Sequence, residues 1–334
     1  MTFEEYLSTN MGIVNEYLGC FYDGEADSDI RKYLYDPLAA FVRNAGKRHR
    51  PLICMLACSA VGGDPEKALR SGAAIELFHN AALVHDDIAD DSTLRRGKPC
   101  MHLEMGMGLA INAGDMALSS MVPAVLSDDG LSEHVKLQVI GQLCEMDLRT
   151  IEGQALDVGW ARDGRFDIEL DDYLKMATLK TAYYSGGIPL AVGAIIGGGT
   201  PEQVEALRRF GMLTGLAFQI QDDLINLVGS EESAGKDFRS DITEGKRTFA
   251  AIHALRNSER SGELEQILDS KATDPELLER AVEIMVDAGS IDAARSYAEG
   301  LVREAKGLLA GAGLRPGELE ILNDMADFFV KRLS

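Results

Sequence analysis

The chain has 334 residues, of which 46% are hydrophobic, and its 54 acidic and 33 basic residues give a formal net charge of −21 at pH 7. This composition excludes an intrinsically disordered chain, because it supplies enough apolar side chains for a sizeable core. The negative charge argues against non-specific binding of nucleic acid, which needs a basic surface, so no nucleic-acid partner is expected.

Helical periodicity predominates along the chain. Apolar residues recur at three-to-four spacing in residues 68–90, 135–158 and 201–228, which is typical of amphipathic helices. Thr200 followed by Pro201 indicates the start of the third of these helices. Alternating strand patterns of useful length are missing, so we predict an all-α fold of about ten or more helices. The apolar face of residues 68–90 is formed by Leu69, Ala73, Leu77, Ala81 and Val84.

The segments that interrupt these helices are short and evenly spread, for example "VGGDP", "LRRGKP", "IGGGTP" and "KATDP". This spacing predicts one helical domain over residues 1–334. The longest apolar run, "GGIPLAVGAIIGGG", is too short to span a bilayer, and the acidic start resembles no signal peptide, so a soluble protein without a transmembrane segment is expected. The five scattered cysteines are typical of reduced thiols in the cytoplasm.

The segment "LVHDDIADDSTLRRGKP" (83–99) concentrates carboxylates at the end of an apolar helical run. On a helix, Asp86 and Asp90 share one face, and Asp87 lies about 100° around the axis. A solvated acidic face is the alternative interpretation, but these acids follow a buried turn directly. Oxygen ligands of this kind suit Mg²⁺, which often binds through carboxylates and substrate phosphates.

A second acidic pair lies far away in "AFQIQDDLIN", where Asp222 and Asp223 follow another apolar helical run and Asn226 occupies the i+4 position from Asp222. Two acidic helix ends can face each other across a helical bundle and hold metal between them. We therefore expect the two clusters to share a metal site.

Basic residues adjoin both acidic clusters, although the chain as a whole is acidic. Arginine offers a planar fork to a phosphate, and lysine offers a point charge. A single lysine is more often a solubilising surface residue, but together these residues predict two phosphate-bearing ligands, one bound through metal and one bound directly. They are Lys47, Arg48, His49, Arg50, Arg95, Arg96, Lys180, Lys236 and Lys246.

In chain order, residues 46–248 carry "GKRHRP", "HDDIADDSTLRRGKP", "AINAGD", "EGQALD", "LKTA", "FQIQDD" and "GKDFRSDITEGKRT". In these motifs the chain resembles the trans-isoprenyl diphosphate synthases (the polyprenyl synthetase family), and most of all the geranylgeranyl diphosphate synthases. The resemblance implies an all-α bundle around a deep central cavity, about three Mg²⁺ ions per active site, and a homodimer. It also implies a prenyltransferase that condenses isopentenyl diphosphate with dimethylallyl, geranyl or farnesyl diphosphate, by Mg²⁺-assisted ionisation, condensation and loss of a proton.

The resemblance further implies roles for single residues. The Mg²⁺ ligands would be Asp86, Asp87, Asp90 and Asp222. The allylic diphosphate would be bound by Arg95, Lys180, Lys236 and Lys246. The metal-free diphosphate of isopentenyl diphosphate would be bound by Lys47, Arg50, His79 and Arg96. The catalytic group near the reacting carbons would be Lys180, Thr181 and Gln219, with Gln154 and Asp157 lining the same cavity.

Asn226 departs from the family pattern, and Phe78, Ala81 and Ala82 bear on product length. Asn226 stands where many members have aspartate, so it is a doubtful ligand. Synthases that make C15 products generally carry an aromatic residue at the positions of Ala81 and Ala82, and this chain does not. Phe78 lies one turn deeper, about 5 Å along the helix, where its ring would end the cavity after C20. If Phe78 faces elsewhere, the product would be C25 or longer.

Rival functions make different demands on the sequence. A class I terpene cyclase would share the fold and the first aspartate motif, but it would lack the isopentenyl-binding "GKRHRP". A prenyltransferase with a non-isoprenoid acceptor would keep most of the motifs. A non-catalytic partner subunit would usually lose aspartates that are all present here.

Overall fold

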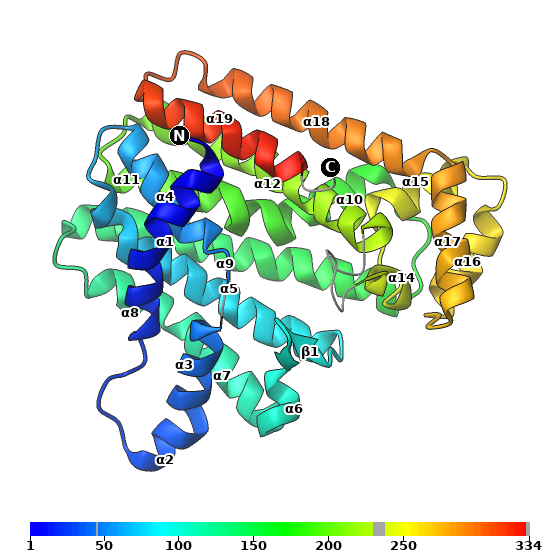
Figure 1. The fold of residues 1–334 in the computed structure, drawn as a ribbon, viewed down its shortest axis with the longest axis horizontal. Coiled ribbons are helices and arrows are strands. Elements are labelled where there is room, and N and C mark those ends of the chain that lie inside the picture. Colours follow the sequence, from blue (N-terminus) through cyan, green and yellow to red (C-terminus); the bar gives the residue numbers. More distant parts are fainter. Residues whose placement is uncertain (45, 230–237, 332–334) are drawn as a thin grey trace. The chain divides into compact units, whose positions relative to one another are not determined.

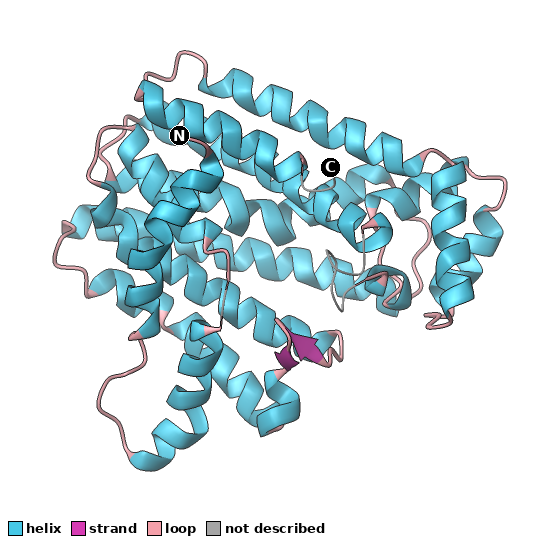
Figure 2. Ribbon diagram, viewed as in Figure 1, coloured by secondary structure: helices cyan, strands magenta, loops and turns pink. Residues whose placement is uncertain are grey.

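The computed structural model describes residues 1–44, 46–229 and 238–331. Within them the regular structure is helical apart from one hairpin of two very short strands (Figure 2). The predicted all-α fold with more than ten helices is confirmed. The chain divides into two compact units, and each unit combines segments that are far apart in the sequence. One domain over residues 1–334 stays a prediction.

The first unit comprises Met1–Asp147, Tyr184–Arg209 and Leu309–Asp324. Its elements are α1 (Phe3–Gly19), α2 (Ser28–Ile30), the π-helix η1 (Arg31–Tyr35), α3 (Asp36–Arg43), α4 (His49–Ala60), the 3₁₀-helix η2 (Pro65–Ala68), α5 (Leu69–Ala89), β1 (Leu94–Arg95), β2 (Lys98–Pro99), α6 (Met101–Met105), α7 (Met107–Ser119), α8 (Met121–Leu126) and α11 (Ile188–Ile196).

The second unit comprises Leu148–Tyr183, Phe210–Leu308 and Met325–Ser334. Its elements are α10 (Leu170–Ala177), α14 (Ser240–Thr243), α15 (Phe249–Asn257), α16 (Ser261–Asp269) and α17 (Pro275–Asp287). Five further elements contribute residues to both units, namely α9 (Glu133–Arg162), the π-helix η3 (Thr178–Gly187), α12 (Pro201–Val228), α18 (Ser290–Leu309) and α19 (Pro316–Val330).

In the first unit, α5 packs against α4 and α7, and α4 also packs against α11 (Figure 1). The predicted apolar face of α5 is buried at Ala73, Leu77, Ala81 and Val84. The close approach of α11 to α4 requires Gly193, because a Cβ there would lie 2.0 Å from the carbonyl oxygen of Cys54. The predicted start of α12 is also confirmed, since the Gln203 amide donates to Thr200 Oγ1.

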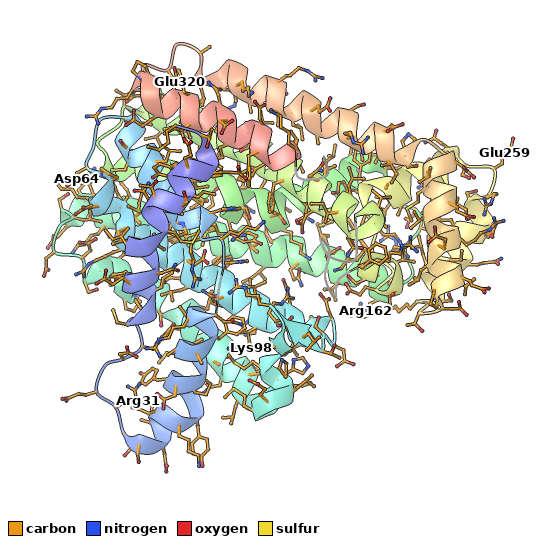
Figure 3. All side chains as sticks on the ribbon, in the orientation of Figure 1. Arg31, Asp64, Lys98, Arg162, Glu259 and Glu320 are labelled. Atoms are coloured by element: carbon orange, nitrogen blue, oxygen red, sulfur yellow. The ribbon has the colours of Figure 1, made fainter. Side chains whose placement is uncertain are left out.

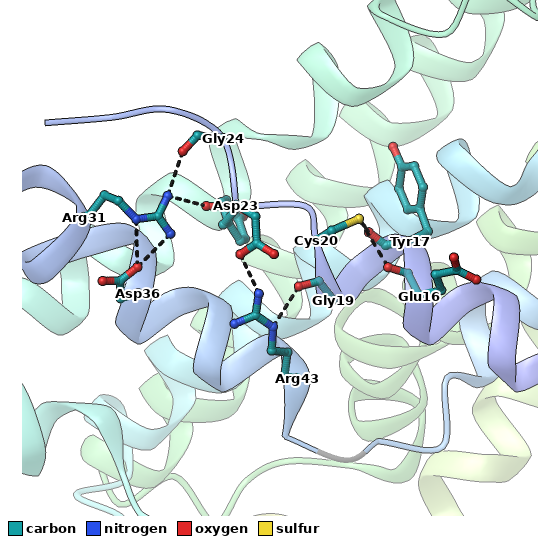
Figure 4. Close-up of polar contacts among 10 residues, drawn as sticks. Glu16, Tyr17, Gly19, Cys20, Asp23, Gly24, Arg31, Asp36 and Arg43 are labelled. Carbon is teal, nitrogen blue, oxygen red and sulfur yellow. Dashed lines mark hydrogen bonds and ion pairs between the residues drawn. The ribbon is translucent and has the colours of Figure 1, made fainter. Parts of the chain in front are cut away.

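Two arginines near the N-terminus hold the connection between α1 and α3 (Figure 4). Arg31 donates to Asp36 Oδ1 and to the Gly24 carbonyl, and Arg43 donates to Asp23 Oδ1 and to the Gly19 carbonyl. Each guanidinium is thus paired with a carboxylate, so these basic residues serve the fold.

Among the described residues, the segment Met107–Leu126 passes a length and hydropathy test for a bilayer-spanning helix. It consists of α7 and α8, and 39% of its most apolar window is buried inside the protein. A short apolar core helix of a soluble protein passes the same test, so this segment does not by itself indicate a membrane span.

Candidate active site

The first acidic cluster lies at the C-terminal end of α5. Asp87 is buried, and its Oδ1 accepts hydrogen bonds from Arg95 Nε at 2.9 Å and Nη2 at 2.6 Å. Asp86 and Asp90 are half-buried. One carboxylate of the motif is therefore oriented by an arginine, and the other two lie nearer the surface, where a ligand can reach them.

The segment "LRRGKP" forms the β1–β2 hairpin, in which Arg95 pairs with Lys98. Arg96 and Gly97 at its turn both have positive φ, 52° and 76°, as a tight two-residue hairpin turn requires. Lys98 lies on this hairpin (Figure 3). The turn directs Arg95 to Asp87 and lets Arg96 donate to the Asn44 carbonyl at 2.8 Å.

Arg50 and Arg96, two cations of the first unit, donate hydrogen bonds to neutral groups. Arg50 Nη2 donates to Ser185 Oγ at 2.9 Å, and its guanidinium lies over the Tyr184 ring, 4.5 Å from the centroid. Within the described residues, Arg50 and Arg96 have only neutral hydrogen-bond partners. No hydrogen-bonded carboxylate in the described part of the chain offsets their charges, so both side chains can attract an anion. Lys47, also predicted for this site, is exposed on the segment before α4.

Arg48, two residues before Arg50, is different. Its guanidinium is buried against Glu76, and both side chains are 2% exposed. It also donates to the carbonyl of Val42 and to Asn15 Oδ1. The charge of Arg48 is thus neutralised inside the protein, so Arg48 serves the fold rather than an anionic ligand.

His79 lies among these arginines and stacks on Tyr184, with ring centroids 5.9 Å apart. Burial, followed by the positive charges of Arg50 and Arg96, holds the pKa of His79 well below its ordinary value. The imidazole is therefore neutral near pH 7. In the described part of the chain, His79 Nδ1 and Arg50 Nε are buried without a hydrogen-bond partner, which is expected of groups that await a polar ligand.

The environment of His79 predicts a dependence of stability on pH. Folding lowers the His79 pKa, so below about pH 6.5 the unfolded chain binds a proton that the folded chain does not. The free energy of unfolding therefore falls as the pH decreases, by up to about 1.4 kcal/mol per pH unit. We expect the free energy of unfolding of the wild type, relative to His79→Gln, to decrease between pH 7.5 and 5.5 in urea titrations. The exposed His134→Gln is the control, and a difference that does not change with pH would contradict this assignment.

In the second unit, Lys180 and Asp157 form a close ion pair, with Nζ 2.5 Å from Oδ2. Burial would raise the pKa of Asp157, but Lys180 and Lys246 outweigh it and hold the pKa below the ordinary value. The pair depends on Gly153, because a Cβ on this residue of α9 would lie 2.2 Å from the Lys180 amide nitrogen. The glycine of the "EGQALD" motif is thus a functional position that the sequence analysis did not single out. Gln154, the next residue of α9, is half-buried.

The π-helix η3 carries Lys180 and Thr181, and π-helical turns are frequent at functional sites. Thr181 Oγ1 donates to Gln219 Oε1 at 2.5 Å, and Gln219 Nε2 donates to Asp223 Oδ1 at 2.6 Å. Tyr173 completes the chain by donating to Asp223 Oδ2 at 2.7 Å. The predicted catalytic residues Thr181 and Gln219 are therefore brought together.

The two acids of the second motif differ in exposure. Asp223 is buried as the acceptor of this chain, and burial together with Asp241 raises its pKa well above the ordinary value. Asp222 is exposed. Asp222 is thus the acid at the surface, and Asp223 is the buried acceptor that orients Gln219.

Asp241 and Lys246 lie close together beyond α12. Lys246 Nζ lies 3.6 Å from Asp241 Oδ1 and also forms an ion pair with Glu244. Burial, partly opposed by Lys246, raises the pKa of Asp241 to about 7, with further contributions from Glu244 and other carboxylates. Carboxylates are therefore crowded in this part of the second unit. Lys236 lies outside the described residues.

Asn226 anchors this segment. Its Nδ2 donates to Ser240 Oγ at 3.1 Å, its Oδ1 accepts from the Asp241 amide at 3.3 Å, and its carbonyl accepts from the Arg239 amide at 2.8 Å. The side chain that replaces the usual aspartate is therefore used as a link between α12 and α14.

The resemblance implies that Lys246 binds the allylic diphosphate. On that basis we expect Asn226→Ala to release the segment that carries Asp241 and Lys246, and to raise the KM for this ligand roughly tenfold, since two hydrogen bonds of about 0.5–1.5 kcal/mol each are lost. Asn226→Asp keeps both links, because a carboxylate accepts from the Asp241 amide and from the Ser240 hydroxyl, and it should retain most activity. Steady-state kinetics with each substrate in turn would measure this. Equal damage from both substitutions would show that Asn226 does not act as this anchor.

The carboxylates fit Mg²⁺ bound together with a substrate rather than in a cage made only of protein. In the described residues, no three His, Cys, Asp or Glu side chains gather as a metal-binding group. Mg²⁺ commonly keeps several waters and takes its remaining ligands from one or two carboxylates and from substrate phosphates. The first unit offers such carboxylates in Asp86 and Asp90, and the second unit offers one in Asp222. That the two acidic clusters face each other stays a prediction.

The residues predicted to set product length lie on α5. Phe78 and Ala81 are buried and Ala82 is half-buried. The Phe78 ring packs edge-on against Tyr184, with centroids 5.7 Å apart. Tyr184, which contacts Arg50, Phe78 and His79, was missed by the sequence analysis, although its position just after "LKTA" could have drawn attention to it.

The chain is similar to several known proteins over most of its length. Residues 31–285 match the family model described as polyprenyl synthetase. The chain is 40% identical to a short chain isoprenyl diphosphate synthase of Methanothermobacter thermautotrophicus, over 93% of this chain and 96% of that protein. It is 35% identical to a geranylfarnesyl diphosphate synthase of Natronomonas pharaonis, over 90% of each. A geranylgeranyl pyrophosphate synthase of Corynebacterium glutamicum, solved with isoprenyl diphosphate and magnesium, superposes with a TM-score of 0.90 at 27% identity, over 99% of this chain and 100% of that one.

Proposed function

Because the chain belongs to the polyprenyl synthetase family and is a prenyltransferase, we propose that it condenses isopentenyl diphosphate with an allylic diphosphate to give geranylgeranyl diphosphate (C20). The observation that carries this proposal is the group formed by Arg50, Arg96 and His79. Two arginines held by neutral partners and one neutral imidazole suit a diphosphate that arrives without metal. Isopentenyl diphosphate is such a ligand, and Lys47 adds a further cation.

The allylic diphosphate is assigned to the carboxylate clusters and their cations. When bound by Asp86, Asp87, Asp90 and Asp222, about three Mg²⁺ ions would neutralise the charge of the diphosphate leaving group. The C. glutamicum relative was solved with magnesium, which supports this cofactor.

The cations around those clusters have related roles. Arg95 is oriented on Asp87, and Lys180 on Asp157. Both side chains can donate to the diphosphate oxygens as negative charge develops. Lys246 would assist from the segment anchored by Asn226, and Lys236 is assigned the same role from its place in the motif.

The reaction follows from these assignments. The allylic C–O bond breaks and leaves a carbocation and diphosphate. The double bond of isopentenyl diphosphate then forms a C–C bond with C1, and a proton is lost to the released diphosphate. The hydroxyl of Thr181 and the amide of Gln219, held together at 2.5 Å, offer dipoles to the cationic carbon. Holding the isopentenyl group by its own diphosphate supplies the orientation that the condensation needs.

Product length is assigned to Phe78. Ala81 and Ala82 have small side chains, and the buried Phe78 ring, which packs against Tyr184, lies about one turn away on α5. The relatives include synthases named for geranylfarnesyl products as well as short-chain ones, so family membership alone does not set the length.

We expect Phe78→Ala to shift the main product from C20 to C25 and longer, because removing the ring opens about the length of one isoprene unit. Thin-layer or mass-spectrometric analysis of the dephosphorylated products measures this. Phe210→Ala, which removes a buried ring from α12, is the control for a general loss of packing. An unchanged product from Phe78→Ala would mean that another residue ends the cavity.

A homodimer is proposed from α9. Leu137, Leu148, Ile151 and Val158 recur on one face of this helix and are 39–69% exposed. These residues are 11, 3 and 7 positions apart, which are sums of the threes and fours typical of helix pairing. Exposed apolar residues that share one face mark an interaction surface. The occupant proposed here is the same face of a second copy, and measurement of the mass in solution by sedimentation tests it.

A cytoplasmic location is also proposed. In the described part of the chain, no disulfide joins any of the five cysteines, as expected of a reducing compartment.

The function is tested by incubating the protein with Mg²⁺, isopentenyl diphosphate and each allylic primer in turn, and by measuring the chain length of the products. We expect consumption of isopentenyl diphosphate, a C20 product, and loss of turnover when a chelator removes Mg²⁺. A C25 or longer product would favour the longer-chain alternative. A cyclic hydrocarbon, or no consumption of isopentenyl diphosphate, would refute the synthase assignment.

A further inference from the structure

Tyr184 lies at the centre of the cation group in the first unit, where three side chains from two helices meet its ring. The guanidinium of Arg50, on α4, lies over one face at 4.5 Å from the centroid. The rings of His79 and Phe78, both on α5, pack against Tyr184 with centroids 5.9 Å and 5.7 Å away. The next residue, Ser185, accepts a hydrogen bond from Arg50 Nη2 at 2.9 Å.

An arginine in a protein is commonly oriented by a carboxylate, as Arg95 is by Asp87 and Arg48 by Glu76. A carboxylate cancels much of the charge that it orients, which weakens a site that must bind an anion without the help of metal ions. An aromatic face holds a guanidinium through its quadrupole and leaves the net charge in place. Arg50 is held in this second way, by the Tyr184 ring and the Ser185 hydroxyl.

We propose that Tyr184 is a positioning residue for the binding of isopentenyl diphosphate. Its ring orients Arg50 and packs against His79, and it leaves the charge of the site intact. This inference rests on the proposed function, because it takes the Arg50–His79 group to be the isopentenyl diphosphate site. The buried Arg50 Nε and His79 Nδ1, which have no hydrogen-bond partner in the described residues, are the atoms that the ring would hold ready for the diphosphate. The ring is needed for this role, and the phenolic oxygen is not.

The test compares Tyr184→Leu with Tyr184→Phe by steady-state kinetics, varying isopentenyl diphosphate and the allylic primer separately. Loss of a partly desolvated cation–π contact is expected to raise the KM for isopentenyl diphosphate about tenfold in Tyr184→Leu, with the KM for the primer changed less than twofold. Tyr184→Phe keeps the ring and should restore the wild-type KM. Ser185→Ala should raise the same KM by a smaller factor.

Tyr33→Leu is the matched control, because Tyr33 is an exposed tyrosine that also lies beneath a cation, Lys32, at 4.8 Å. It should leave both KM values unchanged. Thermal unfolding of each variant shows whether it is folded, and if Tyr184→Leu does not fold, the comparison of Tyr184→Phe with Ser185→Ala decides instead.

Three outcomes would overturn the inference: an equal rise in both KM values for Tyr184→Leu, a longer product with an unchanged KM for isopentenyl diphosphate, or failure of Tyr184→Phe to restore binding. If Ser185→Ala is the one variant that can be measured, an unchanged KM for isopentenyl diphosphate in it would also overturn the inference. A wild-type protein that consumes no isopentenyl diphosphate would instead refute the proposed function, so the two failures can be told apart.

Discussion

Asp222→Asn is expected to lower kcat by about 10³-fold or more while leaving the protein folded. Each 1.36 kcal/mol of lost transition-state stabilisation slows a reaction tenfold, and a bound divalent cation supplies several kcal/mol of charge stabilisation to a leaving group. Asp222 is exposed, so its replacement by a neutral side chain of the same shape should change stability little. Turnover at saturating substrate and Mg²⁺, together with urea unfolding, measures the two effects.

Asp223→Asn is the matched control for this experiment. Its carboxylate is buried and accepts from both Tyr173 and Gln219. An asparagine can accept only through its oxygen, so one donor is left unsatisfied, at a cost of about 1–3 kcal/mol. We therefore expect a loss of stability here that Asp222→Asn does not show. Full activity in Asp222→Asn would remove Asp222 from the metal site.

The second large effect concerns stability. Arg48→Met is expected to destabilise the protein by about 3–5 kcal/mol, because it leaves the buried Glu76 carboxylate without its guanidinium partner. The Val42 carbonyl and Asn15 lose a donor as well. Since a folded domain is stable by only about 5–15 kcal/mol, chemical denaturation should show a large fall in the unfolding midpoint.

Two further variants serve as controls for this prediction. The double variant Arg48→Met with Glu76→Leu should recover much of the lost stability, because a buried ion pair replaced on both sides by apolar groups leaves no uncompensated charge. Arg50→Met should leave the unfolding midpoint close to the wild type and raise the KM for isopentenyl diphosphate about 10- to 100-fold, as expected for a lost charge-assisted hydrogen bond. If Arg48→Met and Arg50→Met behaved alike, the division into a structural and a ligand-binding arginine would be wrong.

The contrast between Arg48 and Arg50 shows which features of the site could be predicted from the sequence and which could not. The segment "GKRHRP" shows three cations side by side, and sequence alone cannot say which of them is neutralised. The partner of Arg48 is Glu76, which lies on another helix 28 residues away. Helical periodicity predicted α5, and the Thr200–Pro201 pair predicted the start of α12. Those patterns are local, whereas the pairing of a charge depends on tertiary packing.

Other features were beyond prediction for related reasons. The π-helical geometry of η3 has no sequence period that distinguishes it from an α-helix over ten residues. The acids Asp222 and Asp223 are neighbours of one type, and only their surroundings divide them into an exposed carboxylate and a buried acceptor. Asn226 was expected to be a poor ligand, and the contacts of its side chain with Ser240 and Asp241 give it a separate use.

The hairpin between α5 and α6 has a consequence for how the binding of one substrate affects the binding of the other. On the proposed assignment, Arg95 serves the allylic diphosphate and Arg96 serves isopentenyl diphosphate, yet a single peptide bond joins them at a turn of two residues. A shift of the turn would move both arginines, so we expect occupancy of one pocket to change the affinity of the other. Thermodynamic linkage makes such heterotropic coupling equal in both directions, and the coupling constant would appear as a primer-dependent dissociation constant for the second diphosphate.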